Sequence, residues 1–290
     1  MNSRPLISVV TASRNYGAWI DDAILSVCRQ GYEPFEHIVV DACSDDGTIE
    51  TLKTHAHLRW TSEPDEGQSD AINKGFKAAA GDWVGWLNAD DYYLPGAFES
   101  VVQYASQNPA VDIIHGYCIF VDHDGLFLRA KVEHEFDFRI LLHYGCYIPS
   151  TATFFRRRVI DDGCLLDPDF HVCMDFDYFV RLAGRGYRFG YLNRPMAAFR
   201  RHQGNRSLDA KARRRERIQV QRNWAGPSLP EAAHDLLSRI MQGKRVAEKL
   251  RSGGLWTEYR LRRQRQRPTA WFRSAEASRF CEELTSGRLS

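Results

Sequence analysis

The first ninety residues alternate between apolar, β-branched segments and amphipathic segments, and this alternation limits the fold more than any other feature. Strands are predicted at residues 6–11, 35–41, 58–62 and 83–87, where apolar and β-branched side chains dominate. Helical patterns separate them, at about 19–30, after Gly47 and at about 68–80. Four strands alternating with three helices are typical of a parallel, doubly wound α/β sheet.

The pattern changes after a predicted helix at 96–107. Shorter, mixed strands follow at 112–121, 126–132 and 153–155, then a helix at 174–183 and two short closing strands at 188–192 and 196–199. We expect these strands to extend the same sheet in antiparallel fashion. The predicted fold class is therefore a Rossmann-like α/β fold with a mixed, mainly parallel sheet flanked by helices. A helical, Arg-rich C-terminal extension begins at about residue 208.

The charge is unevenly distributed along the chain. Residues 1–200 carry 18 basic and 28 acidic side chains, whereas residues 201–290 carry 21 and 9. The basic region has several readings: a solvated helix face, intramolecular pairing with the acidic body, or docking on an anionic membrane. Trp256, Tyr259, Trp271 and Phe272 interleave with the basic residues, and six arginines between 260 and 273 flank the last two, which favours the membrane reading. The alternative is a helix that packs these aromatics against the rest of the protein. No nucleic-acid-binding motif accompanies them, so no nucleic-acid partner is expected.

No apolar run approaches the ~18 residues that a membrane-spanning helix needs, and the N-terminal residues lack a signal-peptide layout. The seven cysteines are scattered and include no CxxC pair, which argues against a disulfide framework or a structural zinc site. The composition therefore predicts a cytoplasmic location.

Two adjacent carboxylates, Asp90 and Asp91, directly follow the apolar strand at 83–87. Open α/β sheets bind ligands just outside the carboxyl ends of their strands. Carboxylates placed there suit Mg²⁺ or Mn²⁺, which bind through one or two carboxylates together with substrate phosphates. The alternative is that both residues start a turn or cap the following helix.

Six motifs in register over residues 5–207 resemble the inverting family-2 glycosyltransferases, which have the GT-A fold. They read ISVVTASRN, IVVDACSDDGT, SEPDEGQSDAINKGFKAAAGDWVGWLNADD, IPSTATFFRR, CMDFDYFVRL and AAFRRHQGNRS. The third motif is the most specific part of the resemblance.

The resemblance implies a pocket for the nucleotide-sugar donor. Carboxylates such as Asp41 and Asp65 accept hydrogen bonds from the N–H groups of a nucleobase. The alternative is that these two are turn residues and Lys74 is a solvated charge. The residues expected to contact the donor are Thr11, Ser13, Asn15, Asp41, Ser44, Asp65, Gly67, Asp70, Lys74, Asn88, Asp90 and Arg200.

The resemblance also implies a divalent cation, Mg²⁺ or Mn²⁺, held against the diphosphate. Many relatives carry Asp where this chain has Asn88, so we expect Asp91 to bear most of the metal load, with help from Asp90. His202 is a further expected ligand, with an ordinary surface or core position as its alternative. Cys43, where many relatives have Gly, changes no charge.

Asp175 matches the general base of the family, which takes the proton of the acceptor hydroxyl. Its neighbour Asp177 faces another direction on the same helix and is expected to pair with Arg181 at i+4. The alternative role for Asp175 is that of a helix N-cap.

Together these observations predict a catalytic domain at 1–207, with a donor-binding half (1–110) and an acceptor half (111–207), and a basic helical region at 208–290. The expected activity is inverting transfer of a sugar from a nucleoside-diphosphate sugar to the hydroxyl of a sugar or lipid-linked acceptor. Surface polysaccharide or glycolipid synthesis at the inner face of a membrane is the expected setting. A sugar-1-phosphate nucleotidyltransferase and a non-catalytic nucleotide-binding scaffold are the alternatives.

Overall fold

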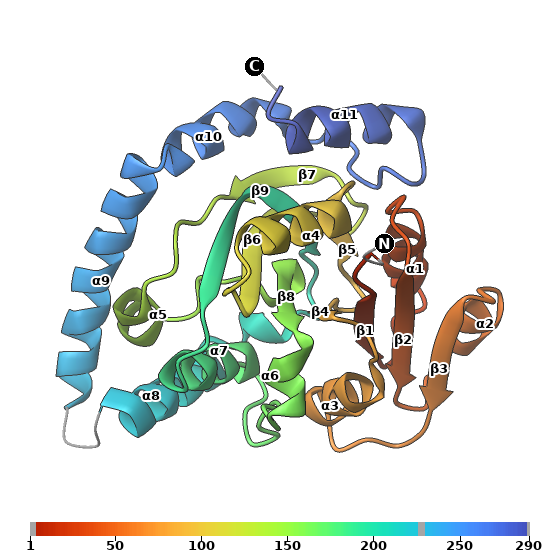
Figure 1. The fold of residues 1–290 in the computed structure, drawn as a ribbon. Coiled ribbons are helices and arrows are strands. Elements are labelled where there is room, and N and C mark those ends of the chain that lie inside the picture. Colours follow the sequence, from red (N-terminus) through yellow and green to blue (C-terminus); the bar gives the residue numbers. More distant parts are fainter. Residues whose placement is uncertain (1–3, 226–229, 289–290) are drawn as a thin grey trace.

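A computed structural model describes residues 4–225 and 230–288, and its centre is a mixed nine-stranded sheet (Figure 1). Eight strands follow the order β3-β2-β1-β4-β8-β6-β9-β5, and β7 (Phe127–Lys131) pairs with β6. Helices lie against the sheet, and further helices form the C-terminal part. The predicted α/β fold with a helical extension is confirmed.

The N-terminal half of the sheet is parallel. It consists of β1 (Ile7–Ser13), β2 (Phe35–Asp41), β3 (Leu58–Ser62) and β4 (Trp83–Trp86). The second half is mixed: β8 (Thr153–Arg156) runs antiparallel to both β4 and β6 (Ile113–Val121). The short β5 (Tyr92–Tyr93) closes the edge against β9. The predicted antiparallel extension is therefore present in part, because β6 and β9 (Phe189–Arg200) pair in parallel.

The helices of the first 200 residues alternate with the strands. Their bounds are Ile20–Cys28 (α1), Thr48–Lys53 (α2), Gln68–Ala78 (α3), Ala97–Gln107 (α4), Phe138–Tyr144 (α5), Arg157–Asp161 (α6) and Met174–Gly184 (α7).

Two local predictions were wrong or incomplete. The two closing strands form one strand, β9 (Phe189–Arg200), because the sheet accommodates Pro195 where the register with β6 shifts around Tyr117. Helix α5 was not predicted, since it is only seven residues long; it starts where the Asp137 side chain accepts a hydrogen bond from the Ile140 N–H (2.9 Å).

The C-terminal region packs on the sheet domain instead of standing apart. Its helices are α8 (Ala210–Ala225), α9 (Glu231–Arg251), α10 (Gly254–Leu261) and α11 (Ala275–Thr285), which curve around one side and the top of the molecule in Figure 1. Arg245 of α9 reaches the fully buried carboxylate of Glu133 at 2.7 Å. Phe280 of α11 shares a core cluster with Tyr92 of β5. Part of the basic charge is thus paired within the molecule.

The aromatic residues of the predicted membrane cluster point inward. Phe272 is 6% exposed and packs edge-on against Tyr92, and the Trp271 indole donates to the Tyr93 carbonyl at 2.9 Å. Arg273 forms ion pairs with Asp21 and Asp22 of α1. The expectation that this pair of aromatics faces a membrane was therefore wrong, because they fill the space between the C-terminal segment and the sheet.

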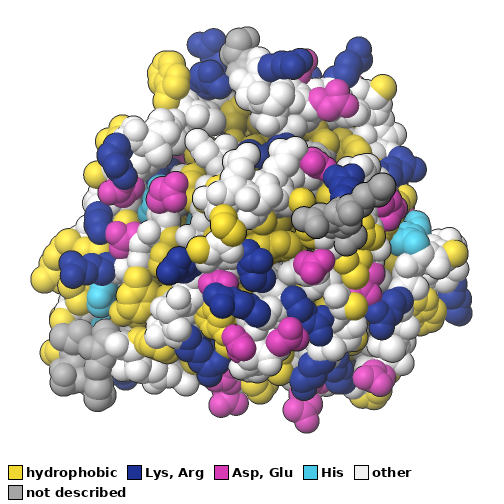
Figure 2. Space-filling model, viewed as in Figure 1, with side chains coloured by type: hydrophobic (Ala, Val, Ile, Leu, Met, Phe, Trp, Pro, Cys, Tyr) yellow, Lys and Arg dark blue, Asp and Glu magenta, His cyan; other side chains and the backbone are white. Residues whose placement is uncertain are grey.

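Exposed apolar side chains lie instead along the outer side of α9 and on α10. They are Leu236, Ile240, Val246, Leu250, Trp256 and Tyr259. In Figure 2, yellow side chains gather at the left edge, where Figure 1 places α9. Within residues 4–225 and 230–288, no helix is long and apolar enough to cross a membrane.

Two helical glycines, one tightly packed and one with open space around it, provide a test of how α3 packs on the sheet. A Cβ on Gly75 of α3 would lie 2.2 Å from the Val10 side chain of β1, whereas one on Gly243 of α9 would meet nothing within 4 Å. We expect Gly75→Ala to lower the free energy of unfolding by about 1–3 kcal/mol through overpacking. Gly243→Ala should raise it by up to about 1 kcal/mol, because alanine favours the helix. Chemical denaturation of both variants measures the difference, and equal effects would contradict the packing of α3.

Candidate functional site

The expected donor residues gather at the carboxyl ends of the four parallel strands. Thr11 and Ser13 end β1, Asp41 ends β2, and Asp65 follows β3, while the Asn88–Asp91 segment follows β4. This is the edge at which open α/β sheets bind ligands. The structure therefore brings together residues that are up to eighty positions apart in the chain.

The Asp41 carboxylate is fully buried and held by two serines. It accepts hydrogen bonds from the Ser44 N–H at 2.9 Å and from the Ser62 hydroxyl at 2.8 Å. Ser44 in turn accepts from the Asn15 N–H at 2.8 Å. Ser13 pairs with Asp41 in the sheet register, and its buried hydroxyl has no partner among the described residues. An unpaired buried hydroxyl costs free energy, so a ligand contact would stabilise it.

The remaining donor candidates have protein partners. Thr11 is buried and bonds to the His37 ring at 3.0 Å, and Asp65 accepts from the Gly67 N–H at 2.9 Å. Lys74 lies about a third exposed on α3, with its ammonium 3.2 Å from both Asp70 and Glu63. The charge of Lys74 is thus shared between two carboxylates in this structure.

The Asp91 side chain is bonded to other parts of the protein. Its carboxylate is fully buried and accepts from the Thr151 hydroxyl (2.7 Å), the Asn88 amide (2.9 Å) and the Arg200 N–H (2.9 Å). Burial, followed by the nearby charge of Asp90, raises the pKa of Asp91 well above its ordinary value. Three protein donors thus contact its two oxygens, which gives Asp91 a structural role; its role as the main metal ligand stays a prediction.

The hydrogen bonds of Asn88 account for a neutral amide at this position. Its amide oxygen accepts from the Trp86 indole at 3.0 Å and from Gln68 at 3.1 Å, while its NH₂ group donates to Asp91. A carboxylate at this position would lose the donor and place like charges together. Asn88 therefore lets the Asp91 carboxylate stay buried.

Asp90 and His202 face each other beside a small cavity. The His202 Nε2 atom lies 2.8 Å from Asp90 Oδ2, and Asn205 donates to the same oxygen at 3.3 Å. The His202 ring packs on the Trp19 indole, with centroids 4.3 Å apart. Asp90 lines a cavity of about 120 Å³, where its carboxylate is available to a ligand. A carboxylate suits Mg²⁺ or Mn²⁺ at a diphosphate, and the imidazole beside it would suit a transition metal such as Mn²⁺.

Arg200 does not meet the expectation of a phosphate contact. It is 1% exposed, and its guanidinium donates to Asp22 (2.6 Å), to the His123 carbonyl (2.7 Å) and to the Asp90 carbonyl (2.9 Å). These bonds tie α1, the β6–β7 turn and the acidic segment together. Arg200 therefore positions the site from behind, and it is not among the residues that line the cavity.

Asp175 lies in the first turn of α7, where two cavities meet. Asp90 and Asn88 line the smaller one, and α8 residues line the larger one, of about 440 Å³; Asp175 lines both. Cys173, not Asp175, occupies the N-cap position, so the capping alternative does not account for this carboxylate. Asp177 pairs with Arg181 at 2.7 Å, as predicted.

The environment of Asp175 favours a basic carboxylate. Burial raises its pKa, although hydrogen bonds from the Phe176 N–H (2.7 Å) and the Cys146 side chain act in the opposite direction. A carboxyl group with a raised pKa is a stronger base once deprotonated. The geometry at the junction of two cavities therefore suits proton abstraction.

Glu216 of α8 fixes the start of α7. This 3% exposed carboxylate accepts hydrogen bonds from three consecutive N–H groups, those of His171 (3.2 Å), Val172 (2.9 Å) and Cys173 (2.8 Å). This role was not predicted, because an isolated Glu in an Arg-rich helix carries no signal of a distant partner. Of the residues that line the smaller cavity, only Asn88, Asp90 and Asp175 were predicted; Tyr16, Gln68 and Trp86 are among those that were not.

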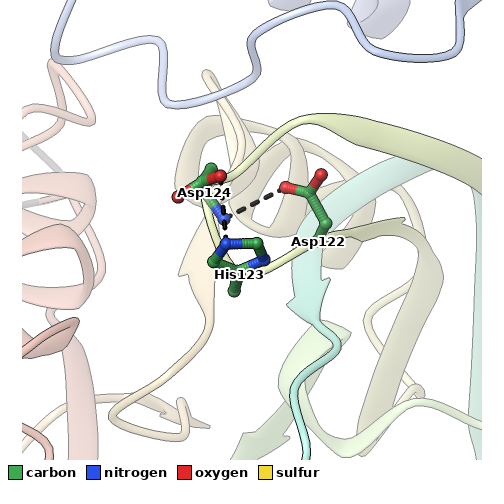
Figure 3. Close-up of side chains that lie close together, drawn as sticks. All are labelled: Asp122, His123 and Asp124. Carbon is green, nitrogen blue, oxygen red and sulfur yellow. Dashed lines mark hydrogen bonds and ion pairs between the residues drawn. The ribbon is translucent and has the colours of Figure 1, made fainter.

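A second acidic group lies on the β6–β7 turn (Figure 3). The ligand atoms of Asp122, His123 and Asp124 all lie within 4.8 Å of one another. Asp122 accepts from the N–H groups of Asp124 and Leu126, which is the usual bonding of an Asp that starts a turn. This group is explained by the turn and is separate from the cavity at Asp90.

Comparison with known proteins identifies the family of this chain. The profile described as glycosyl transferase family 2 matches residues 8–164. An uncharacterised glycosyltransferase of Nostoc is 27% identical over 254 residues, covering 83% of this chain and 78% of the relative. TuaG of Bacillus subtilis, a putative teichuronic acid biosynthesis glycosyltransferase, is 31% identical over 210 residues, covering 69% and 80%.

Solved structures show the same fold. Staphylococcus aureus TarS in complex with UDP-GlcNAc has a TM-score of 0.63 at 18% identity, covering 86% of this chain and 75% of that one. The mannosyltransferase PcManGT of Pyrobaculum calidifontis, in complex with GDP-Man and Mn²⁺, has a TM-score of 0.58 at 19% identity, covering 81% and 69%. Since the family profile spans more than half of the chain and carries the strand ends and the acidic segment described above, this protein belongs to glycosyl transferase family 2.

Proposed function

We propose that this glycosyltransferase moves a sugar from a nucleoside-diphosphate sugar to an acceptor hydroxyl with inversion at the anomeric carbon. The observation that carries the proposal is the position of Asp175 between two cavities, with Asp90 on one side only. The donor then occupies the side of Asp90, Asn88 and the strand ends, and the acceptor approaches from the other side. Donor complexes of TarS with UDP-GlcNAc and of PcManGT with GDP-Man support this class of substrate.

In this reaction the acceptor oxygen forms a bond to the anomeric carbon while the bond from that carbon to the phosphate oxygen breaks. Asp175 takes the proton of the acceptor hydroxyl, and the electron pair of the broken bond leaves with the nucleoside diphosphate. Attack from the side opposite the leaving group inverts the anomeric centre. Asp41, Asp65, Ser13 and Asn15 would hold the nucleoside at the strand ends.

Asp90 and His202 would hold Mg²⁺ or Mn²⁺, with Mn²⁺ in the PcManGT complex as support. When bound, the cation would supply positive charge to the leaving diphosphate. Asp91 and Arg200 would keep the acidic segment in place without contacting the cation.

TuaG, named for teichuronic acid biosynthesis, supports a role in surface polysaccharide or glycolipid synthesis. We place this activity in the cytoplasm, at the inner face of a membrane when the acceptor is lipid-linked. Incubation with a panel of UDP- and GDP-sugars and Mn²⁺ tests the proposed function. Release of nucleoside diphosphate without pyrophosphate identifies sugar transfer or donor hydrolysis. Release of pyrophosphate would indicate a nucleotidyltransferase, and no turnover of any donor would favour a scaffold.

The proposed cation site predicts different effects of substitution at the neighbouring residues Asp90 and Asp91. We expect Asp90→Asn to abolish the Mn²⁺ dependence of UDP or GDP binding, because it removes the charged ligand that faces the cavity. Asp91→Asn should retain that dependence and lower the thermal midpoint, since Asp91 contacts only protein donors. Calorimetric titration of both variants, with and without Mn²⁺, measures this. The opposite pattern would return the metal role to Asp91.

The role of Asp175 predicts both a rate and a pH dependence. Asp175→Asn should lower turnover by about 10²–10⁴-fold with nearly unchanged donor affinity, which is the usual contribution of a general base. Because its pKa is raised, the wild-type enzyme should lose activity on acidification at a higher pH than an ordinary Asp would cause. Asp177→Asn is the matched control and should affect stability but not the acidic limb. A collapse of donor affinity in Asp175→Asn would make Asp175 a binding residue.

Peripheral contact with an anionic membrane is proposed for the exposed apolar side chains of α9 and α10. Exposed Arg239, Arg251, Arg262 and Arg263 lie in the same segment, and each basic residue near such a surface contributes about 1 kcal/mol, less at high salt. We expect salt-sensitive co-sedimentation with anionic but not neutral vesicles. Leu250→Glu should weaken it, and Trp271→Phe, which changes an inward-facing residue, should not. Negligible pelleting at every salt concentration would remove this proposal.

A further inference from the structure

The larger of the two cavities at Asp175 is built by the C-terminal region. Its volume of about 440 Å³ falls in the range of small-molecule sites, ~300–1,000 Å³. One wall comes from Tyr144 and Cys146 beside α5, and another comes from the first turns of α8. It shares Val172, Asp175 and Ser207 with the donor-side cavity. An acceptor that reaches Asp175 from this side would therefore touch α8.

The charge of this cavity is strongly positive. Arg213, Arg214 and Arg217 line it, and within the described part of the chain Asp175 is the only acidic residue among its lining residues. Arg213 and Arg217 are four positions apart and thus lie on the same face of α8. The carboxylate of Glu216 lies between them in sequence but is directed at the three N–H groups before α7.

Arg213 and Arg217 are held near the cavity and are at most partly neutralised. Arg217 donates to the Tyr144 carbonyl at 3.4 Å and lies 3.7 Å from Asp235, which Arg214 also approaches, at 3.4 Å. Arg213 donates to the Ser207 carbonyl, and no carboxylate of the described chain forms an ion pair with it. Arg213 also lies near the N-terminus of α8, where the helix dipole disfavours a cation. Arg213 is exposed to solvent, so its guanidinium is accessible to an anion, which the helix dipole would favour slightly.

We infer that the acceptor carries an acidic group, a carboxylate or a phosphate, which binds to Arg213 and Arg217 while the reacting hydroxyl meets Asp175. This inference rests on the proposed function and adds the acceptor class to it. Guanidinium groups bind carboxylate and phosphate in the same forked geometry, so the site is defined by this shared chemistry. The arginines also offset the effect that a second negative charge would have on the base, which would otherwise be pushed towards its protonated form.

Binding of three matched sugars tests the inference: methyl glucoside, methyl glucuronide and methyl glucoside 6-phosphate. With the full-length protein and UDP–Mn²⁺ present, titration followed by NMR should show at least one acidic sugar binding roughly tenfold or more tighter than the neutral one. That factor is the usual effect of one charge-assisted hydrogen bond. The carboxylate and phosphate arms show which acidic group is preferred, and either preference supports the inference.

Substitutions on α8 test whether Arg213 and Arg217 cause the preference. The double substitution Arg213→Gln and Arg217→Gln should bring the ratio of affinities for acidic and neutral sugars close to one. Arg215 is an exposed residue of α8 that does not line the cavity, so Arg215→Gln should leave this ratio unchanged. Equal binding of neutral and acidic sugars, or a preference that survives the double substitution, would overturn the inference. A loss of UDP affinity in the double variant would also overturn it, because the arginines would then serve the donor.

Binding of UDP with Mn²⁺ to the wild-type protein is measured on the same samples. If UDP binds and no acidic sugar is preferred, only the acceptor inference fails. If UDP and GDP both fail to bind, the proposed function fails before the acceptor is tested.

Discussion

The buried Asp91 carboxylate is the interaction on which the rest of the site depends. It accepts hydrogen bonds from the end of β4, from the segment before β8 and from the end of β9, which joins three parts of the chain at one point. A buried carboxyl group without hydrogen-bond partners would cost free energy. Asn88 supplies one of the three donors to Asp91. The neighbouring Asp90 bonds to His202 and Asn205 and lines the smaller cavity.

The fold was predictable where the pattern is local and periodic. The parallel strands and α3 follow from alternating apolar segments, and the sequence motifs selected the strand-end carboxylates and Asp175, whose roles stay predictions. What the sequence did not reveal depends on contacts between distant segments. The joining of the last two strands across Pro195 depends on a register shift in β6, and the buried position of Arg200 depends on acceptors contributed by three different elements.

The same limit affects two assignments of charged residues. Adjacent aspartates look equivalent in sequence, and only the tertiary structure shows that Thr151 and Arg200 occupy one of them. The basic residues of the C-terminal region likewise look similar in sequence but have different partners in the structure. Arg245 neutralises the buried Glu133, Arg273 pairs with α1, and arginines of α8 line a cavity beside Asp175. A net charge can therefore not distinguish a docking surface from an internal ion pair.

The double use of α8 has a consequence for the modularity of this enzyme. Glu216 holds the backbone before Asp175, and arginines on either side of it line the adjoining cavity. Exchange of the C-terminal helices between related enzymes would thus alter the alignment of the proposed base together with the proposed acceptor surface. Recombination or engineering would have to treat α8 and the 171–175 segment as a single inherited unit. A fragment that ends at residue 207 would contain Asp175 but not Glu216, which holds the backbone before it.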